Sequence, residues 1–77
     1  MKFEKLEVVV LAHDIPEHGL RSGDLGTVVE IYADKSVEVE FVRGSGVTQA
    51  LLTLSLHDLR KIGSHDLLTT RRLAKVS

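Results

Sequence analysis

The sequence predicts an all-β fold, a small five-stranded barrel, on three observations. The first is period-2 alternation, which is clearest from Val37 to Phe41, where apolar residues alternate with glutamates. The second is the spacing of short polar or glycine-rich links between successive apolar stretches. The third is size, because 77 residues hold one small domain, and closing a short sheet removes its exposed edges.

Each strand is identified by its composition and by the turn that follows it. The first is apolar on both faces, which favours a central position in the sheet or one that closes a barrel. The second is rich in β-branched residues and forms an antiparallel hairpin with the third through the polar link Ala33–Ser36. A turn at Arg43–Gly46 leads into the fourth. The predicted strands are, in order, Glu7–Ala12, Leu25–Tyr32, Val37–Phe41, Val47–Leu54 and Arg60–Ile62.

Two further segments connect these strands. Residues His13–Ser22 are polar and interrupted by Pro16 and Gly19, so a long surface loop is expected there. Ser55 is a candidate N-cap with Asp58 three residues later, which predicts a single 3-10 turn before the last strand.

The predicted core is drawn from the inward positions of these elements. It comprises Val8, Val10, Ile15, Val28, Ile31, Val37, Val39, Phe41, Leu52, Leu54 and Leu59.

A Gly-Asp-x-Gly turn precedes the second strand. Gly23 and Gly26 bracket a tight bend in which one or both are expected to need a positive φ. Asp24 is expected to accept hydrogen bonds from neighbouring backbone N–H groups. The role of these three residues is therefore predicted to be structural. A phosphate-binding loop would need more glycines, and a helix would have to follow it.

This turn, together with the segments on either side of it, resembles a known group of folds. The run Arg21–Val29 (RSGDLGTVV), with the long loop before it and the hairpin after it, resembles an SH3-like barrel. Its Gly-Asp-x-Gly-Thr-Val segment is similar to the opening turn of KOW-type modules. Over residues 6–62 the chain is similar to a family of small bacterial SH3-like proteins of unknown function. The resemblance implies the fold and carries no activity.

The chain divides into a predicted barrel over residues 1–62 and a tail over residues 63–77. Residues 1–62 hold seven basic and ten acidic side chains, whereas the tail has a net charge of +2. For the tail a short helix, a docked irregular segment and disorder all remain open, because its apolar residues do not repeat cleanly at helical spacing.

Composition excludes several classes of function. Without cysteine there is no disulfide framework and no thiol nucleophile, which fits a cytoplasmic location. The longest apolar run, Val8–Ala12, is far shorter than the ~20 residues of a membrane span, and no export signal is recognisable. Few aromatic residues and no basic stripe in the body argue against a polyproline groove and a single-strand nucleic-acid platform.

The long loop gathers titratable side chains without forming a standard site. His13, Asp14, Glu17 and His18 match no established metal-ligand spacing, so a solvated acidic loop is the preferred interpretation. No serine or threonine stands in a recognisable nucleophile context. We therefore expect no enzyme activity, no metal and no cofactor.

Protein–protein interaction is the function that remains. We expect a small adaptor or accessory subunit, or an antitoxin-like inhibitor, that binds another protein or a second copy of itself. A strand edge, the long loop and the tail are its candidate surfaces. The alternative is a KOW-type nucleic-acid-associated protein that uses the basic tail. The candidate interaction residues are His13, Asp14, Glu17, His18, Leu67, Leu68, Arg71, Arg72 and Lys75.

Overall fold

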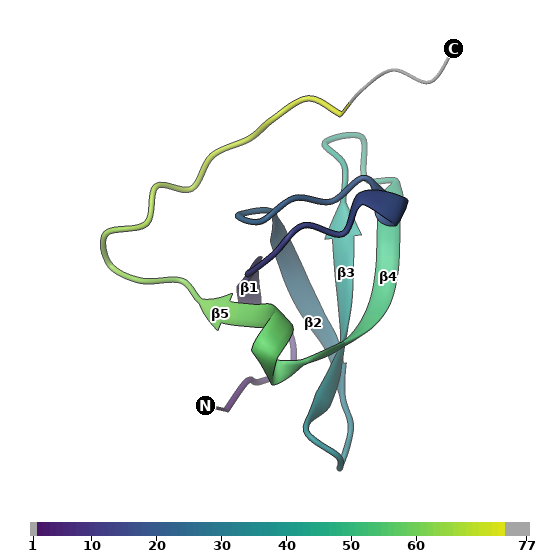
Figure 1. Ribbon diagram of the computed structural model, residues 1–77, viewed down its shortest axis with the longest axis vertical. Coiled ribbons are helices and arrows are strands. Elements are labelled where there is room, and N and C mark those ends of the chain that lie inside the picture. Colours follow the sequence, from purple (N-terminus) through teal and green to yellow (C-terminus); the bar gives the residue numbers. More distant parts are fainter. Residues whose placement is uncertain (1, 74–77) are drawn as a thin grey trace.

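The fold is one antiparallel sheet of five strands, described over residues 2–73 by a computed structural model (Figure 1). The strand order is β4-β3-β2-β1-β5. The strands are β1 (Val8–Leu11), β2 (Leu25–Ile31), β3 (Ser36–Val42), β4 (Thr48–Ser55) and β5 (Leu59–Lys61). The predicted all-β class and its five strands are confirmed.

Two 3-10 turns, where the sequence predicted one, occur in this part of the chain. The predicted turn is η2 (Leu56–Asp58), capped as expected, since the Ser55 hydroxyl accepts from the backbone N–H of His57 and Asp58 accepts from that of Ser55. The additional turn is η1 (Pro16–His18), within the long loop. Proline at its first position suits a helix start, because the fixed φ is already helical.

The sheet has two edges, β4 and β5, which are joined through η2. Strand β4 is eight residues long and contains no charged side chain. Strand β5 pairs with β1, with Lys61 opposite Val9. This pairing brings the beginning and the end of the folded body (residues 8–61) together on one side of the sheet.

The core lies on the inner face of the curved sheet. Val9, Val28 and Val39 are completely inaccessible to solvent. Of the residues predicted for it, most are buried, and Ile15 and Leu52 pack against the core from partly exposed positions. Core residues that the sequence reasoning did not select are Phe3, Val9, Leu11, Leu20 and Ala50.

Two core predictions are wrong. Val9 and Leu11 face the core, so Val8, of opposite parity, lies outside it and is 42% exposed. Val10, of the same parity as Val8, is 3% exposed but lies outside the core cluster as well. Ile31 is 41% exposed because it is the last residue of β2, where the β2–β3 hairpin extends beyond the other strands (Figure 1).

The tail has neither helix nor strand over residues 63–73. It leaves β5, swings away from the folded body and returns above the long loop (Figure 1). None of the helical segments within residues 2–73 is both long and apolar enough to cross a membrane.

Candidate interaction site

The long loop is a compact structure fixed by its own backbone. Ile15 and Leu20 form an isolated antiparallel bridge around η1. Gly19 ends η1 with a φ of 69°, and its N–H donates to the carbonyl of Pro16. Leu20 is only 3% exposed and secures the loop to the core. The loop therefore presents a defined set of groups, among them the outward carbonyl of Gly19.

The turn that follows the loop is tied to β1. The backbone N–H of Gly23 donates to the carbonyl of Leu11 at 2.8 Å, and the N–H of Leu11 donates to the carbonyl of Asp24. Gly23 has a φ of 96°, which L-residues with a side chain rarely adopt. The Asp24 Oδ2 atom accepts from the backbone N–H of Arg21 at 2.8 Å, which fixes the orientation of the carboxylate.

Gly26 serves a different purpose from Gly23, because its φ lies outside the positive range. A Cβ atom at this position would lie 2.5 Å from Cγ1 of Val39 and 2.9 Å from Cε1 of Phe41. The absence of a side chain thus lets these two core residues pack directly against the backbone of β2.

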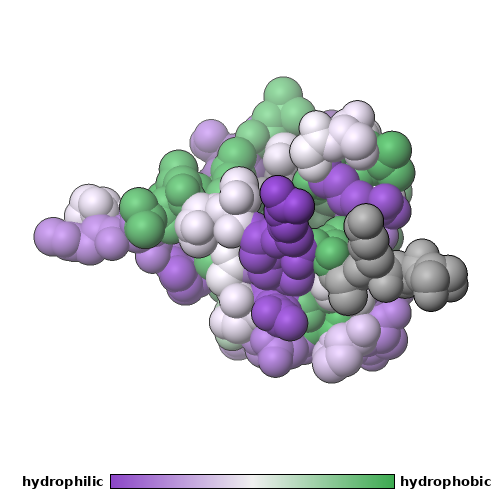
Figure 2. Space-filling view, turned by 90° about the horizontal axis from the view of Figure 1, so that it is seen from above, coloured by the Kyte–Doolittle hydropathy of each residue, from purple (hydrophilic) through white to green (hydrophobic). Residues whose placement is uncertain are grey.

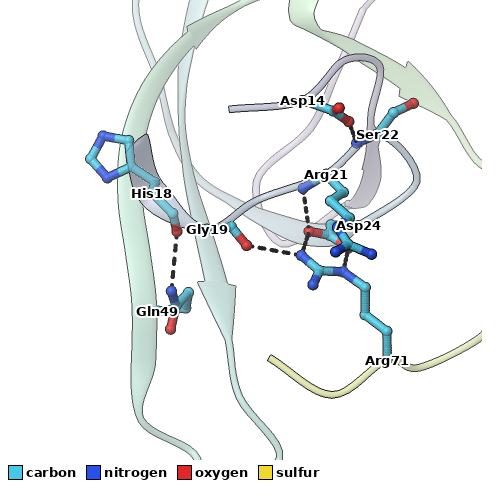
Figure 3. A network of polar contacts seen from close by, with 8 residues as sticks. All are labelled: Asp14, His18, Gly19, Arg21, Ser22, Asp24, Gln49 and Arg71. Carbon is cyan, nitrogen blue, oxygen red and sulfur yellow. Dashed lines mark hydrogen bonds and ion pairs between the residues drawn. The ribbon is translucent and has the colours of Figure 1, made fainter. Parts of the chain in front are cut away.

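The tail returns to this turn through Arg71. Its Nε and Nη2 atoms donate to Oδ1 and Oδ2 of Asp24 at 2.8 and 2.6 Å, and Nη2 also donates to the carbonyl of Gly19 at 2.9 Å (Figure 3). The side chains of Arg71 and Asp24 are only 27% and 18% exposed. Two parallel N–H···O bonds are the geometry in which a guanidinium and a carboxylate interact most strongly.

The electrostatics of this pair favour its charged form. Burial opposes ionisation of Asp24, but the hydrogen bonds from Arg71 and from the Arg21 N–H outweigh it, and the Asp24 pKa is lowered. The hydrogen bond to Asp24 in turn raises the pKa of Arg71. Both groups remain ionised throughout the physiological range.

A groove of about 620 Å³ lies between the tail and the folded body. Its floor includes the buried Leu20 and Phe41, and its other wall is the tail from Thr69 to Leu73. Figure 2, which looks down on this end of the molecule, shows hydrophobic side chains beside a strip of hydrophilic ones. The face thus combines apolar surface with charge.

The other end of the tail is held by Asp66. Its carboxylate accepts from Arg60 at 2.7 and 3.0 Å and from the backbone N–H of Gly63 at 2.6 Å. Between the two anchors, Leu67 and Leu68 are 85% and 60% exposed. No backbone N–H from residue 67 to 73 donates to another group of residues 2–73. The tail is therefore an extended segment fixed at two points, with solvent-facing leucines between them.

The four titratable loop residues do not converge. His13 lies at the far side of the loop, where its Nε2 is 2.6 Å from Asp58 Oδ1 and its Nδ1 is 3.0 Å from the carbonyl of Asp14. Asp14 accepts from the Ser22 N–H, and His18 contributes its backbone carbonyl to the side chain of Gln49 (Figure 3). Glu17 makes no hydrogen bond or ion pair with the described residues, so the four form no common site.

The surroundings of His13 make it an unsuitable ligand or base. The hydrogen bond to Asp58, supported by the one to the Asp14 carbonyl, raises the His13 pKa. Because both neighbours are acceptors, the imidazolium form satisfies both ring nitrogens as donors. Over residues 2–73 no group of three or more histidine and acidic side chains is placed to hold a metal ion.

Two further candidate interaction residues, Arg72 and Lys75, belong to the tail. Arg72 is exposed, whereas Lys75 lies outside the described residues. Sequence reasoning selected Arg71 but did not predict its contact with Asp24, and it did not select the anchor at Asp66. The Gly63-x-x-Asp66 spacing is a local signal for the anchor at Asp66, because an aspartate carboxylate readily accepts from a nearby backbone N–H. The pairing of residues 24 and 71 has no local signal.

Comparison with known proteins gives one match. Residues 5–61 match the model of a family described as "Domain of unknown function (DUF4926)". No curated protein and no solved structure shows significant similarity. The match spans the folded body and ends before the tail.

Proposed function

The chain belongs to the DUF4926 family, and we propose from its own geometry that it is a non-catalytic protein-interaction module. It binds another protein through the anchored tail, as an adaptor, an accessory subunit or an antitoxin-like inhibitor. The observation that carries this proposal is the exposure of Leu67 and Leu68 between two fixed points.

Two physical arguments support this use of the tail. Covering two adjacent solvent-facing leucines with a partner favours binding by about 25 cal/mol per Å² of apolar area buried. A segment that ion pairs already hold extended also loses less conformational entropy on binding. The backbone N–H groups of residues 67–73, which donate to no other group of residues 2–73, are available to pair with a partner strand.

Affinity capture from the host lysate tests the proposal. The baits are the full chain, the variant L67S/L68S and the control variant L6S/L51S, whose two leucines are 76% and 53% exposed and do not line the groove beside the tail. We expect a stoichiometric protein that the full chain and the control retain at high salt and that L67S/L68S loses. Equal retention by all three baits would contradict the tail as the contact.

The remaining expectations form part of the same proposal. The strand order, with a long loop after β1 and a 3-10 turn before β5, supports the resemblance to SH3-like barrels. A cytoplasmic location is supported by the absence of cysteine. Self-association is tested by light scattering over a hundredfold range of concentration, where a mass that stays at 8.5 kDa would rule it out.

The nucleic-acid alternative loses support from the position of Arg71. Its guanidinium makes three hydrogen bonds to the folded body, so phosphate contact would first have to break them. Recovery of nuclease-sensitive material that salt releases would favour this alternative over the protein partner.

A further inference from the structure

The folded body builds a receptor for a guanidinium group. All three acceptor atoms around Arg71 belong to the body: two carboxylate oxygens of Asp24 and the carbonyl oxygen of Gly19. Each has a fixed direction, because the Arg21 N–H orients the carboxylate and the left-handed conformation of Gly19 orients the carbonyl. The receptor therefore does not depend on the tail for its shape.

The charge and shape of this receptor select arginine. Two parallel acceptors match the planar fork of a guanidinium, whereas a lysine ammonium is a point charge that cannot make the same pair of bonds. Asp14 adds further negative potential and raises the pKa of Arg71. Two residues later, half-buried Leu73 lines the same groove and the neighbouring hollow beside the loop. The recognised pattern is therefore an arginine followed at the second position by an aliphatic residue.

The tail is a replaceable occupant of this receptor. From residue 67 to residue 70 the tail makes no hydrogen bond to the folded body. Within the described residues, the polar contacts that fix the returning end of the tail come from one side chain, Arg71. An ion pair that is partly exposed contributes modestly to stability, so another segment of the same chemistry can compete for the site.

We propose that Asp24 and the Gly19 carbonyl form an arginine-recognition site for a partner protein, whose Arg-x-aliphatic segment takes the place of Arg71 and Leu73. The tail is the resident ligand of this site within its own chain. This inference rests on the proposed function and names the chemistry of the partner at the same face. When the partner's arginine displaces Arg71, the anchor at Asp66 beside Leu67 and Leu68 remains in place.

A labelled, capped peptide of residues 68–73 (LTTRRL) is the probe, and fluorescence polarisation measures its binding to full-length protein. The variant R71S has an empty receptor and is expected to bind the peptide at least tenfold more tightly than the wild type, whose own Arg71 competes. The variant R71S/D24N is expected to lose at least tenfold in affinity relative to R71S. Asparagine keeps an oxygen that can accept from the Arg21 N–H, and circular dichroism verifies the fold.

Peptide variants make the test independent of folding. Lysine in place of the first arginine is expected to weaken binding to R71S at least tenfold, whereas alanine in place of the second arginine is expected to leave it unchanged, because Arg72 is exposed. Equal binding of the lysine and arginine peptides, or no binding to folded R71S, would overturn the inference. Capture of a partner through Leu67 and Leu68 would still stand in that case, and the two failures are therefore distinguishable.

Discussion

Replacement of Gly26 by alanine tests whether the packing of β2 against the core depends on a missing side chain. The added Cβ would lie 2.5 Å from Cγ1 of Val39, where ordinary carbon–carbon contacts are ~3.5–4.0 Å. Val39 is completely inaccessible to solvent and Phe41 is 2% exposed, so both already pack closely inside the sheet. Overpacking of this kind typically costs about 1–3 kcal/mol, and we expect about 3 kcal/mol here. In a domain of this size that corresponds to a fall in Tm of roughly 12–24 °C.

A double-mutant cycle identifies the cause of this loss. Removing the two methyl groups of Val39 in V39A costs about 2–3 kcal/mol alone, as lost burial and a cavity. In G26A/V39A the new methyl group fills that cavity, so the double variant should be at least 1 kcal/mol more stable than the sum of the single effects predicts.

Urea denaturation followed by far-UV circular dichroism gives the free energies of unfolding. Gly44→Ala is the matched control, because no atom lies within 4 Å of its added Cβ, and its effect should stay within about 0.5 kcal/mol. The steric explanation is refuted if G26A is as stable as the wild type or if the cycle is additive.

Three further predictions concern the loop and the turns. The hydrogen bond to Asp58 raises the pKa of His13, so the stabilisation from this ion pair is fully present below pH 6.5 and is lost as the pH rises through the folded pKa of His13. The pKa of Asp58 is lowered, so the same stabilisation is also lost in acid, as the pH falls through the folded pKa of Asp58. The urea midpoint should therefore be lower at pH 9 than at pH 6, and H13Q should reduce this difference. Ser55→Ala removes a capping box and should cost about 1 kcal/mol in the same assay. Gly23→Ala, at a φ of 96°, should cost about 1–2 kcal/mol, and an unchanged midpoint would contradict the conformational argument.

The strands could be predicted from the sequence because each pattern is local. Alternation in β3 separates its buried valines from its glutamates, and the polar links on either side define its hairpins. The capping box at Ser55 and Asp58 is equally local, since the three-residue spacing fixes both hydrogen bonds. In these places the residues next to one another in sequence are also the ones that interact.

The face of β1 could not be predicted, because Val8 to Leu11 are all apolar and alternation gives no parity. The structure turns Val9 and Leu11 to the core and leaves Val8 partly exposed. The position of η1 was missed for a related reason. Pro16 and Gly19 indicate a turn, but a polar loop does not reveal that it will fold compactly around Leu20.

The candidate site depends on contacts between distant residues. Asp24 and Arg71 are 47 positions apart, and His13 and Asp58 are 45 apart. The sequence identifies each of these side chains as a charged or titratable group. Which side chain it pairs with depends on where the folded sheet places the tail and η2. The same distance explains why Arg71 was predicted to contact a partner or nucleic acid, although its guanidinium is bound by the body.

The pairing of β1 with β5 also has a kinetic consequence. Strands β2, β3 and β4 are joined by short turns and can assemble early, because closing a short loop costs little entropy. Val9 opposite Lys61 requires nearly the whole body to be in place, so this ladder is expected to close last and to open first. The tail follows directly from β5. A partner that pulls on the tail therefore acts on the least persistent ladder of the sheet, and one that covers it slows the first step of unfolding.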